Sequence, residues 1–159
     1  MLNNKKGFTL IEILVVISIV GLLSSVFLVG LSGFRARGRD AKRLADVKSV
    51  QNGMELYYTR CARYPGDATC AGADGAIDWS ILSGTLTNPA LGLGITKIPV
   101  DPLAARKYLY GVGNGGQSYV IGAILENFGD PSLINDVDGF IYGIDCSGGA
   151  VDTIYCVQF

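Results

Sequence analysis

The strongest constraint on this chain is an apolar stretch close to its N-terminus, from Gly7 to Leu31. Within it the only charged side chain is Glu12, and the other polar side chains belong to one threonine and three serines. At roughly 1.5 Å per residue, a helix of about 24 residues extends about 36 Å, which exceeds the roughly 30 Å hydrocarbon core of a bilayer. The sequence therefore predicts a membrane-spanning helix over residues 8–31.

Glu12 is the one costly side chain in this predicted helix. An isolated carboxylate near the centre of a bilayer costs about 3 kcal/mol on insertion scales, so Glu12 is expected to need a positively charged partner. If the chain were cleaved after Gly7, Phe8 would carry a new N-terminal amine four residues before Glu12. In a packed array of helices this amine would neutralise the Glu12 of a neighbouring subunit.

The residues around this point resemble a known family. Gly7-Phe8-Thr9-Leu10-Ile11-Glu12, preceded by two lysines and followed by an apolar helix, closely resembles the processing site of type IV prepilins and type II secretion pseudopilins. The resemblance implies that a prepilin peptidase removes a leader of residues 1–7 and that Phe8 is N-methylated. It also implies that Glu12 aligns each incoming subunit in a helical filament. A single-pass anchor, with Glu12 at the membrane interface, is the alternative.

The helix is predicted to continue beyond the anchor as an amphipathic segment over residues 32–59, which contain no proline. Apolar side chains recur there at steps of three and four residues, namely at Ala41, Leu44, Val47, Val50 or Gln51, Met54 and Tyr57 or Tyr58. This spacing places one apolar face along the helix. The family resemblance implies an α+β fold in which this long N-terminal helix packs on a small antiparallel β-sheet, as in pilins.

Five basic residues follow the apolar stretch, at Arg35, Arg37, Arg39, Lys42 and Arg43. They are predicted to contact lipid headgroups before assembly and acidic side chains of neighbouring subunits after it. A nucleic-acid partner is not favoured, because the formal net charge of the chain is −1 and provides no overall attraction to phosphates.

Residues 60–159 are predicted to form one globular domain. Its first part, up to Arg106, is rich in loops, with a short helix over 77–82 that carries Trp79 as a core residue. Alternating apolar residues then predict four strands, over 108–112, 118–125, 140–144 and 153–158, joined into an antiparallel sheet.

The four cysteines, Cys61, Cys70, Cys146 and Cys156, all lie outside the apolar stretch. An even number of cysteines in an exported domain favours disulfides, and four cysteines allow three pairings. The local pairs Cys61–Cys70 and Cys146–Cys156 are favoured, because each would tie a segment rich in glycine and alanine. Closing a loop of about ten residues stabilises a fold by roughly 2–3 kcal/mol. Free thiols in a reducing compartment are the alternative.

Acidic residues between the predicted strands form the one candidate metal site, at Asp130, Asp136 and Asp138. Carboxylates in a short, tight run suit Ca²⁺, and the resemblance to major pseudopilins implies a calcium site in the loops near the end of the sheet. The sequence lacks the glutamate that closes an EF-hand loop, and these residues also suit ordinary turns. Apart from calcium, no cofactor is expected.

Nothing in the sequence favours catalysis. The chain contains no histidine, the commonest general base and zinc ligand, and no nucleophile stands beside a base. The sequence therefore predicts a structural protein rather than an enzyme.

The function predicted from these features is that of the major pilin of a type IV pilus. The partners implied are identical subunits, a prepilin peptidase, an assembly ATPase and an inner-membrane platform protein. The expected location is the cytoplasmic membrane, with the N-terminus inside, and after assembly a filament at the cell surface. The alternative within the family is the major pseudopilin of a type II secretion system. Outside it, the alternative is a singly anchored sensor or binding domain.

Overall fold

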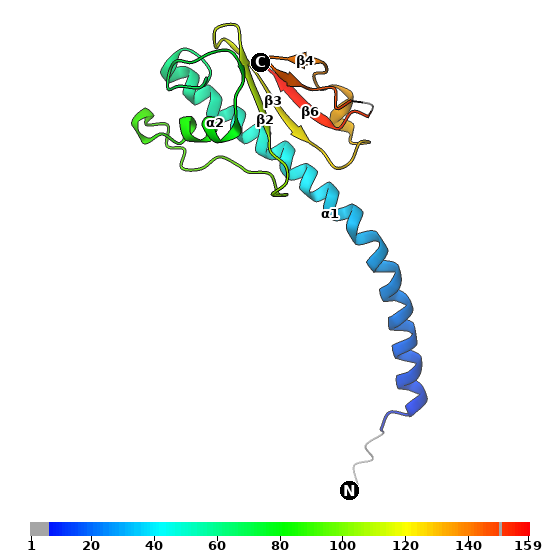
Figure 1. Cartoon of the computed structure of the whole chain (residues 1–159). Helices are drawn as coiled ribbons and strands as arrows, with labels where there is room; N and C mark the ends of the chain where they lie inside the picture. The colour runs from blue at the N-terminus through cyan, green and yellow to red at the C-terminus, as the bar shows by residue number, and fades with distance from the viewer. Residues whose placement is uncertain (1–6, 150) are drawn as a thin grey trace. The chain divides into compact units, whose positions relative to one another are not determined.

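The computed structural model describes residues 7–149 and 151–159, without the side chains of residues 26–32. The chain divides between Ala36 and Arg37 into two compact units, and helix α1, Leu10–Cys61, contributes to both (Figure 1). In the part of the chain that the structure describes, no helix is both long enough and apolar enough to span a bilayer. The predicted span over 8–31 includes residues whose side chains lie outside the described part.

Unit 2, Arg37–Phe159, holds the sheets and the shorter helices. Its helical elements besides α1 are α2 (Trp79–Leu86) and the 3₁₀ turns η1 (Pro89–Leu91) and η2 (Pro131–Ile134). Its strands are β1 (Gly75–Ala76), β2 (Leu109–Gly113), β3 (Ser118–Ile124), β4 (Phe140–Ile141), β5 (Ile144–Asp145) and β6 (Ile154–Gln158).

The main sheet has the strand order β1-β2-β3-β6, and all its neighbours are antiparallel. Strands β2 and β3 form the predicted hairpin. Its turn places Asn114, Gly115 and Gly116 at φ values of 55°, 67° and 81°. Glycine adopts this left-handed region without a steric penalty, and asparagine tolerates it better than most residues.

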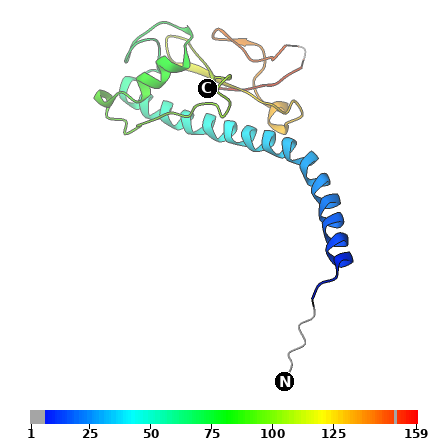
Figure 2. The same cartoon turned by 60° about the horizontal axis from the view of Figure 1, so that its bottom comes forward.

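The C-terminal part of α1 supplies one wall of the hydrophobic core. Val47, Val50, Met54 and Tyr57, at successive steps of three and four residues, are at most 2% exposed. They share a buried cluster with sheet residues that include Tyr110, Val112, Tyr119 and Ile121. Figures 1 and 2 show the sheet lying over this part of the helix. The predicted α+β arrangement of a helix on a small antiparallel sheet is confirmed.

The other face of the main sheet is covered by a second, smaller sheet. Val120 of β3 packs there with Ile144, Cys146 and Cys156 in a separate buried cluster. The covering element is the hairpin β4–β5, so the prediction of one strand over 140–144 is wrong. The chain reverses at Tyr142 and Gly143, whose φ values are 47° and 84°.

Helix α2 begins later than predicted because Asp78 caps it. The Asp78 side chain accepts a hydrogen bond from the Ser80 amide, so the helix begins at Trp79. Trp79 is 7% exposed, and its indole N–H donates to the Pro99 carbonyl at 3.0 Å. The prediction that Trp79 is a core residue is confirmed.

Candidate assembly site

Thr9 and Glu12 cap the N-terminus of helix α1. The Thr9 amide and hydroxyl both donate to Glu12 Oε2 at 2.7 Å, and the Glu12 amide donates to the Thr9 hydroxyl at 3.3 Å. This reciprocal pair is a capping box, in which a threonine before the helix and a glutamate three residues later satisfy otherwise unpaired amides. Sequence reasoning missed it, although the pattern Thr9-x-x-Glu12 is its signature.

The predicted cleavage point lies just before this cap. Gly7 and Phe8 are exposed and precede the first helical residue, Leu10. The Phe8 side chain is 85% exposed. The rest of the predicted leader, residues 1–6, lies outside the described residues. No described residue covers the Gly7–Phe8 bond, so a protease could reach it. Glu12 lies about one helical turn after Phe8.

The helix of unit 1 presents apolar side chains on every side. Five consecutive residues, Ile13 to Ile17, are each 50–60% exposed, and consecutive residues point around the full circumference of a helix. A helix that is apolar all round is typical of a membrane span or of the interior of a larger assembly.

The serine hydroxyls of this helix find their hydrogen-bond partners within the helix itself. The hydroxyls of Ser18, Ser24 and Ser25 each donate to a carbonyl three or four residues earlier in the same helix. Glu12 therefore carries the only charge on the helix surface between Phe8 and Ser25.

In unit 2, two of the five basic residues belong to a partly buried charge cluster of Arg39, Asp40, Arg43, Asp101 and Glu126. The Arg43 side chain is 0% exposed and forms ion pairs with Asp40, Asp101 and Glu126 at 2.7–2.8 Å. Asp40 in turn accepts hydrogen bonds from the amides of Glu126 and Asn127 at 2.9 and 3.0 Å.

These contacts change the predicted role of the basic residues. The expectation that Arg39 and Arg43 face headgroups or neighbouring subunits is wrong, because both pair with carboxylates of their own chain. Hydrogen bonds from Arg39 and Arg43 lower the pKa of Glu126 to about 2, against the opposing effect of burial. Arg35 and Arg37 are exposed, as expected for such a contact surface.

The structure brings two of the three predicted metal ligands together. Carboxylate oxygens of Asp136, Asp138 and Asp152 lie within 4.8 Å of one another. Asp130 is not in this group, because its carboxylate caps η2 and accepts from the Ser132 amide at 2.9 Å. Sequence reasoning missed Asp152, which lies two residues before β6 and close to the other two carboxylates.

Asp136 is the most constrained member of this group. Its Oδ2 accepts from the Cys156 amide at 2.9 Å, whereas its buried Oδ1 has no hydrogen-bond partner among the described residues. Burial raises the pKa of Asp136, and the neighbouring carboxylates of Asp152 and Asp138 add to the effect. Three carboxylates this close together, one of which has a buried oxygen without a partner, offer ligands of the kind that a hard divalent cation takes.

The structure joins the cysteines in two local disulfides. Cys61 is bonded to Cys70, and Cys146 to Cys156. The first holds the end of α1 to the loop that follows it. The second joins the segment after β5 to β6 and is fully buried.

Comparisons with known proteins agree with this arrangement. The family described as "Prokaryotic N-terminal methylation motif" matches residues 2–28. The Type II secretion system core protein G of Pectobacterium carotovorum subsp. carotovorum is 31% identical over 115 residues, which cover 72% of each chain. The protein of the same name from Aeromonas hydrophila is 27% identical over 152 residues, 96% of this chain and 92% of its own.

A pilus protein also matches, over a shorter range. The Fimbrial protein of Neisseria meningitidis serogroup B is 35% identical over 68 residues, 43% of this chain and 40% of its own. No solved structure matches the chain significantly. The capped apolar helix, the helix-on-sheet fold and these likenesses agree. The chain therefore belongs to the family of type IV pilins and type II secretion pseudopilins.

Proposed function

We propose that the chain is the major structural subunit of a type IV pilus. A prepilin peptidase cleaves the precursor after Gly7, Phe8 is N-methylated, and the mature subunit polymerises through its N-terminal helix. Its role is mechanical, not catalytic. Before assembly the precursor is held in the cytoplasmic membrane, and an assembly ATPase with a platform protein moves the mature subunit into the filament.

One observation carries this proposal: the helix of unit 1 exposes apolar side chains all round and bears a single carboxylate. Such a surface needs lipid or other helices as its surroundings. Polymerisation exchanges lipid contacts for helix–helix contacts, and Gly21 beside Ser25 on one helix face permits close approach. The Glu12 carboxylate then pairs with the Phe8 amine of a neighbouring subunit.

A second candidate function is that of the major pseudopilin of a type II secretion system. The relatives that cover almost the whole chain are type II secretion core proteins, whereas the fimbrial match covers 43% of it. The two disulfides favour the pilus, because a long-lived surface filament gains most from covalent cross-links. Electron microscopy of material sheared from cells separates the two, since only a pilus extends beyond the cell surface.

We also propose that Asp136, Asp138 and Asp152 hold a calcium ion. Its charge would compensate three neighbouring carboxylates and tie the loop before β4 to the start of β6. The unpaired Oδ1 of Asp136 supports this proposal.

Substitutions at Glu12 test the assembly proposal. Glutamine is accepted in a capping box, so Glu12→Gln keeps the helix cap but removes the charge, whereas Glu12→Ala removes both. If the charge pairs with a neighbouring amine, both variants remain in the membrane and lose filaments by at least about tenfold, which corresponds to 1.4 kcal/mol. Filament yield at the wild-type level from Glu12→Gln would show that the carboxylate acts only as a cap.

A further inference from the structure

The Cys146–Cys156 disulfide anchors the loop of residues 136–139, which carries two of the three clustered aspartates. At one end of this loop, the Cys156 amide donates to Asp136 Oδ2 at 2.9 Å, and the amide of the following residue donates to the Cys156 carbonyl at 3.1 Å. At the other end, the Cys146 amide donates to the Gly139 carbonyl at 2.8 Å. Each half of the disulfide therefore holds one end of the loop.

The same disulfide closes the segment that carries the third aspartate, Asp152. Cys146 and Cys156 have a sequence separation of 10, and Asp152 lies between them. Its Oδ1 accepts a hydrogen bond from the Ile154 amide at 3.1 Å, at the start of β6. A methyl group on Gly122 of β3 would lie 3.1 Å from Cys156 Sγ, so this glycine makes room for the disulfide against the sheet. One buried cross-link thus joins the segments that carry all three carboxylates.

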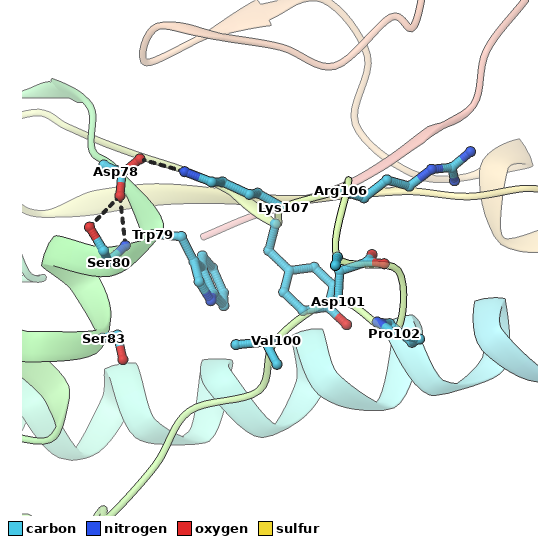
Figure 3. A pocket seen from close by; sticks show the side chains of 11 residues that line it. Asp78, Trp79, Ser80, Ser83, Val100, Asp101, Pro102, Arg106 and Lys107 are labelled. Carbon is cyan, nitrogen blue, oxygen red and sulfur yellow. Dashed lines mark hydrogen bonds and ion pairs between the residues drawn. The ribbon is translucent and has the colours of Figure 1, made fainter.

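Two further aspartates line the cavity between α2 and the loop that precedes β2, but both already have partners (Figure 3). Asp78 accepts from the Ser80 amide at 2.8 Å and lies 3.5 Å from the Lys107 ammonium. Asp101 is paired with a buried arginine at 2.7 Å. Among the described residues, one group of three acidic side chains lies close enough together to hold a metal ion, that of Asp136, Asp138 and Asp152. Calcium binding by this chain therefore reports on the segments that the disulfide joins.

We propose that the Cys146–Cys156 disulfide controls calcium binding: the oxidised chain holds the ion, and the reduced chain loses most of its affinity. The two cysteines are positioning residues, because they act through the segments that carry the ligands. Without the bond these segments move more independently, and ordering them when the ion binds costs conformational entropy. The inference rests on the calcium ion proposed above at Asp136, Asp138 and Asp152.

Formation of this bond requires an oxidant. The two thiols give up two electrons and two protons, which an external disulfide such as oxidised glutathione takes up as it is reduced to two thiols. Such oxidising conditions are found outside the cytoplasm. The chain therefore gains its calcium affinity only after the domain is exported. Calcium in turn stabilises the bond against reduction, because the coupling between two equilibria is reciprocal.

Calcium titration of the purified full chain in detergent tests this coupling. The oxidised wild type is compared with Cys146→Ala/Cys156→Ala and with the matched control Cys61→Ala/Cys70→Ala, which removes a disulfide of nearly equal sequence separation, 9 against 10. The first variant is expected to bind calcium at least about tenfold more weakly than the wild type, and the control to stay within about twofold. Equal calcium affinity of both variants and the wild type would overturn the coupling and leave the calcium site in place.

A redox titration of the wild type gives a readout that does not require the alanine variants to fold. The chain is equilibrated in glutathione buffers with calcium or with chelator, and alkylation followed by mass spectrometry gives the reduced fraction of each disulfide. Saturating calcium is expected to lower the equilibrium constant for reduction of Cys146–Cys156 at least about tenfold, and to change that of Cys61–Cys70 by less than about twofold. No shift, or an equal shift of both disulfides, would overturn the coupling. If the oxidised wild type binds no calcium, the calcium proposal and the coupling fall together, while the filament function stands.

Discussion

Arg43 donates two parallel hydrogen bonds to Asp101, from Nε to Oδ2 at 2.7 Å and from Nη2 to Oδ1 at 2.9 Å. The pair connects helix α1 to the loop before β2 across 58 residues of sequence. Burial alone would raise the pKa of Asp101, but the hydrogen bonds from Arg43 and from the Leu103 amide lower it below its ordinary value. This contact fixes where the loop before β2 lies on the helix.

Removing the guanidinium should therefore destabilise unit 2 strongly. Arg43→Met leaves the buried carboxylates of Asp40 and Asp101 without their partner, a change that costs about 3–5 kcal/mol. Chemical unfolding of the full chain in detergent measures the loss. The matched variant Arg37→Met removes an exposed arginine and should change the free energy of unfolding by at most about 0.5 kcal/mol. Equal effects of the two variants would show that the charge cluster does not stabilise the fold.

Acid should weaken the fold through Glu126. The pKa of Glu126 is about 2 in the folded chain, against an ordinary value of 4.5. Between these values the unfolded chain binds the proton more readily, so the free energy of unfolding falls as the pH falls through this window. Glu126→Gln should be less stable than the wild type at neutral pH and should lose less stability on acidification. The pH dependence of Tm for both proteins measures this difference.

Asp136 acts in the opposite sense, because its pKa is raised in the folded chain. Its contribution is common to the wild type and to Glu126→Gln, so it cancels in the comparison. Parallel Tm curves for the two proteins across the acid range would contradict the assigned role of Glu126.

Calcium should stabilise the loop between η2 and β6. A ligand that binds only the folded state at a hundred times its Kd adds about 2.7 kcal/mol to the free energy of unfolding. Calcium is therefore expected to raise Tm, a chelator to lower it, and Asp152→Asn to reduce the response. Asp130→Asn is the matched control, since asparagine still caps η2 and Asp130 is outside the ligand group. A Tm that is unchanged by both calcium and chelator would exclude the site.

The two disulfides should differ in their access to reductant. Cys146 and Cys156 are 0% exposed, whereas Cys70 is exposed and Cys61 is half-buried. Because thiol–disulfide exchange requires a thiolate to reach a sulfur, a mild reductant should open Cys61–Cys70 first. Alkylation followed by mass spectrometry at increasing reductant concentration gives the order. Earlier labelling of Cys146 or Cys156 would contradict it.

Local patterns predicted much of this molecule. The apolar spacing of α1 predicted its buried face at Val47, Val50 and Met54, because a helical period is a property of neighbouring residues. The alternation on either side of Asn114 predicted the β2–β3 hairpin for the same reason. The second sheet was missed, because its turn holds Tyr142 in a left-handed conformation that the sequence does not signal.

Two of the features that sequence reasoning missed depend on distant partners. Five basic residues between positions 35 and 43 resembled an exposed surface, but Arg43 pairs with carboxylates 58 and 83 residues away, after the chain has folded back on α1. Asp152 joins Asp136 and Asp138 only because β6 returns alongside β3. The Thr9–Glu12 cap was also missed, although it is local and its signature was readable in the sequence.

The central claim is that this chain becomes a filament subunit through cleavage before Phe8. Its most direct test is the intact mass of the protein recovered from its own host, together with electron microscopy of the same preparation. The account predicts filaments built of a chain that begins at N-methylated Phe8. A chain that retains residues 1–7, in a preparation without any polymer, would contradict it.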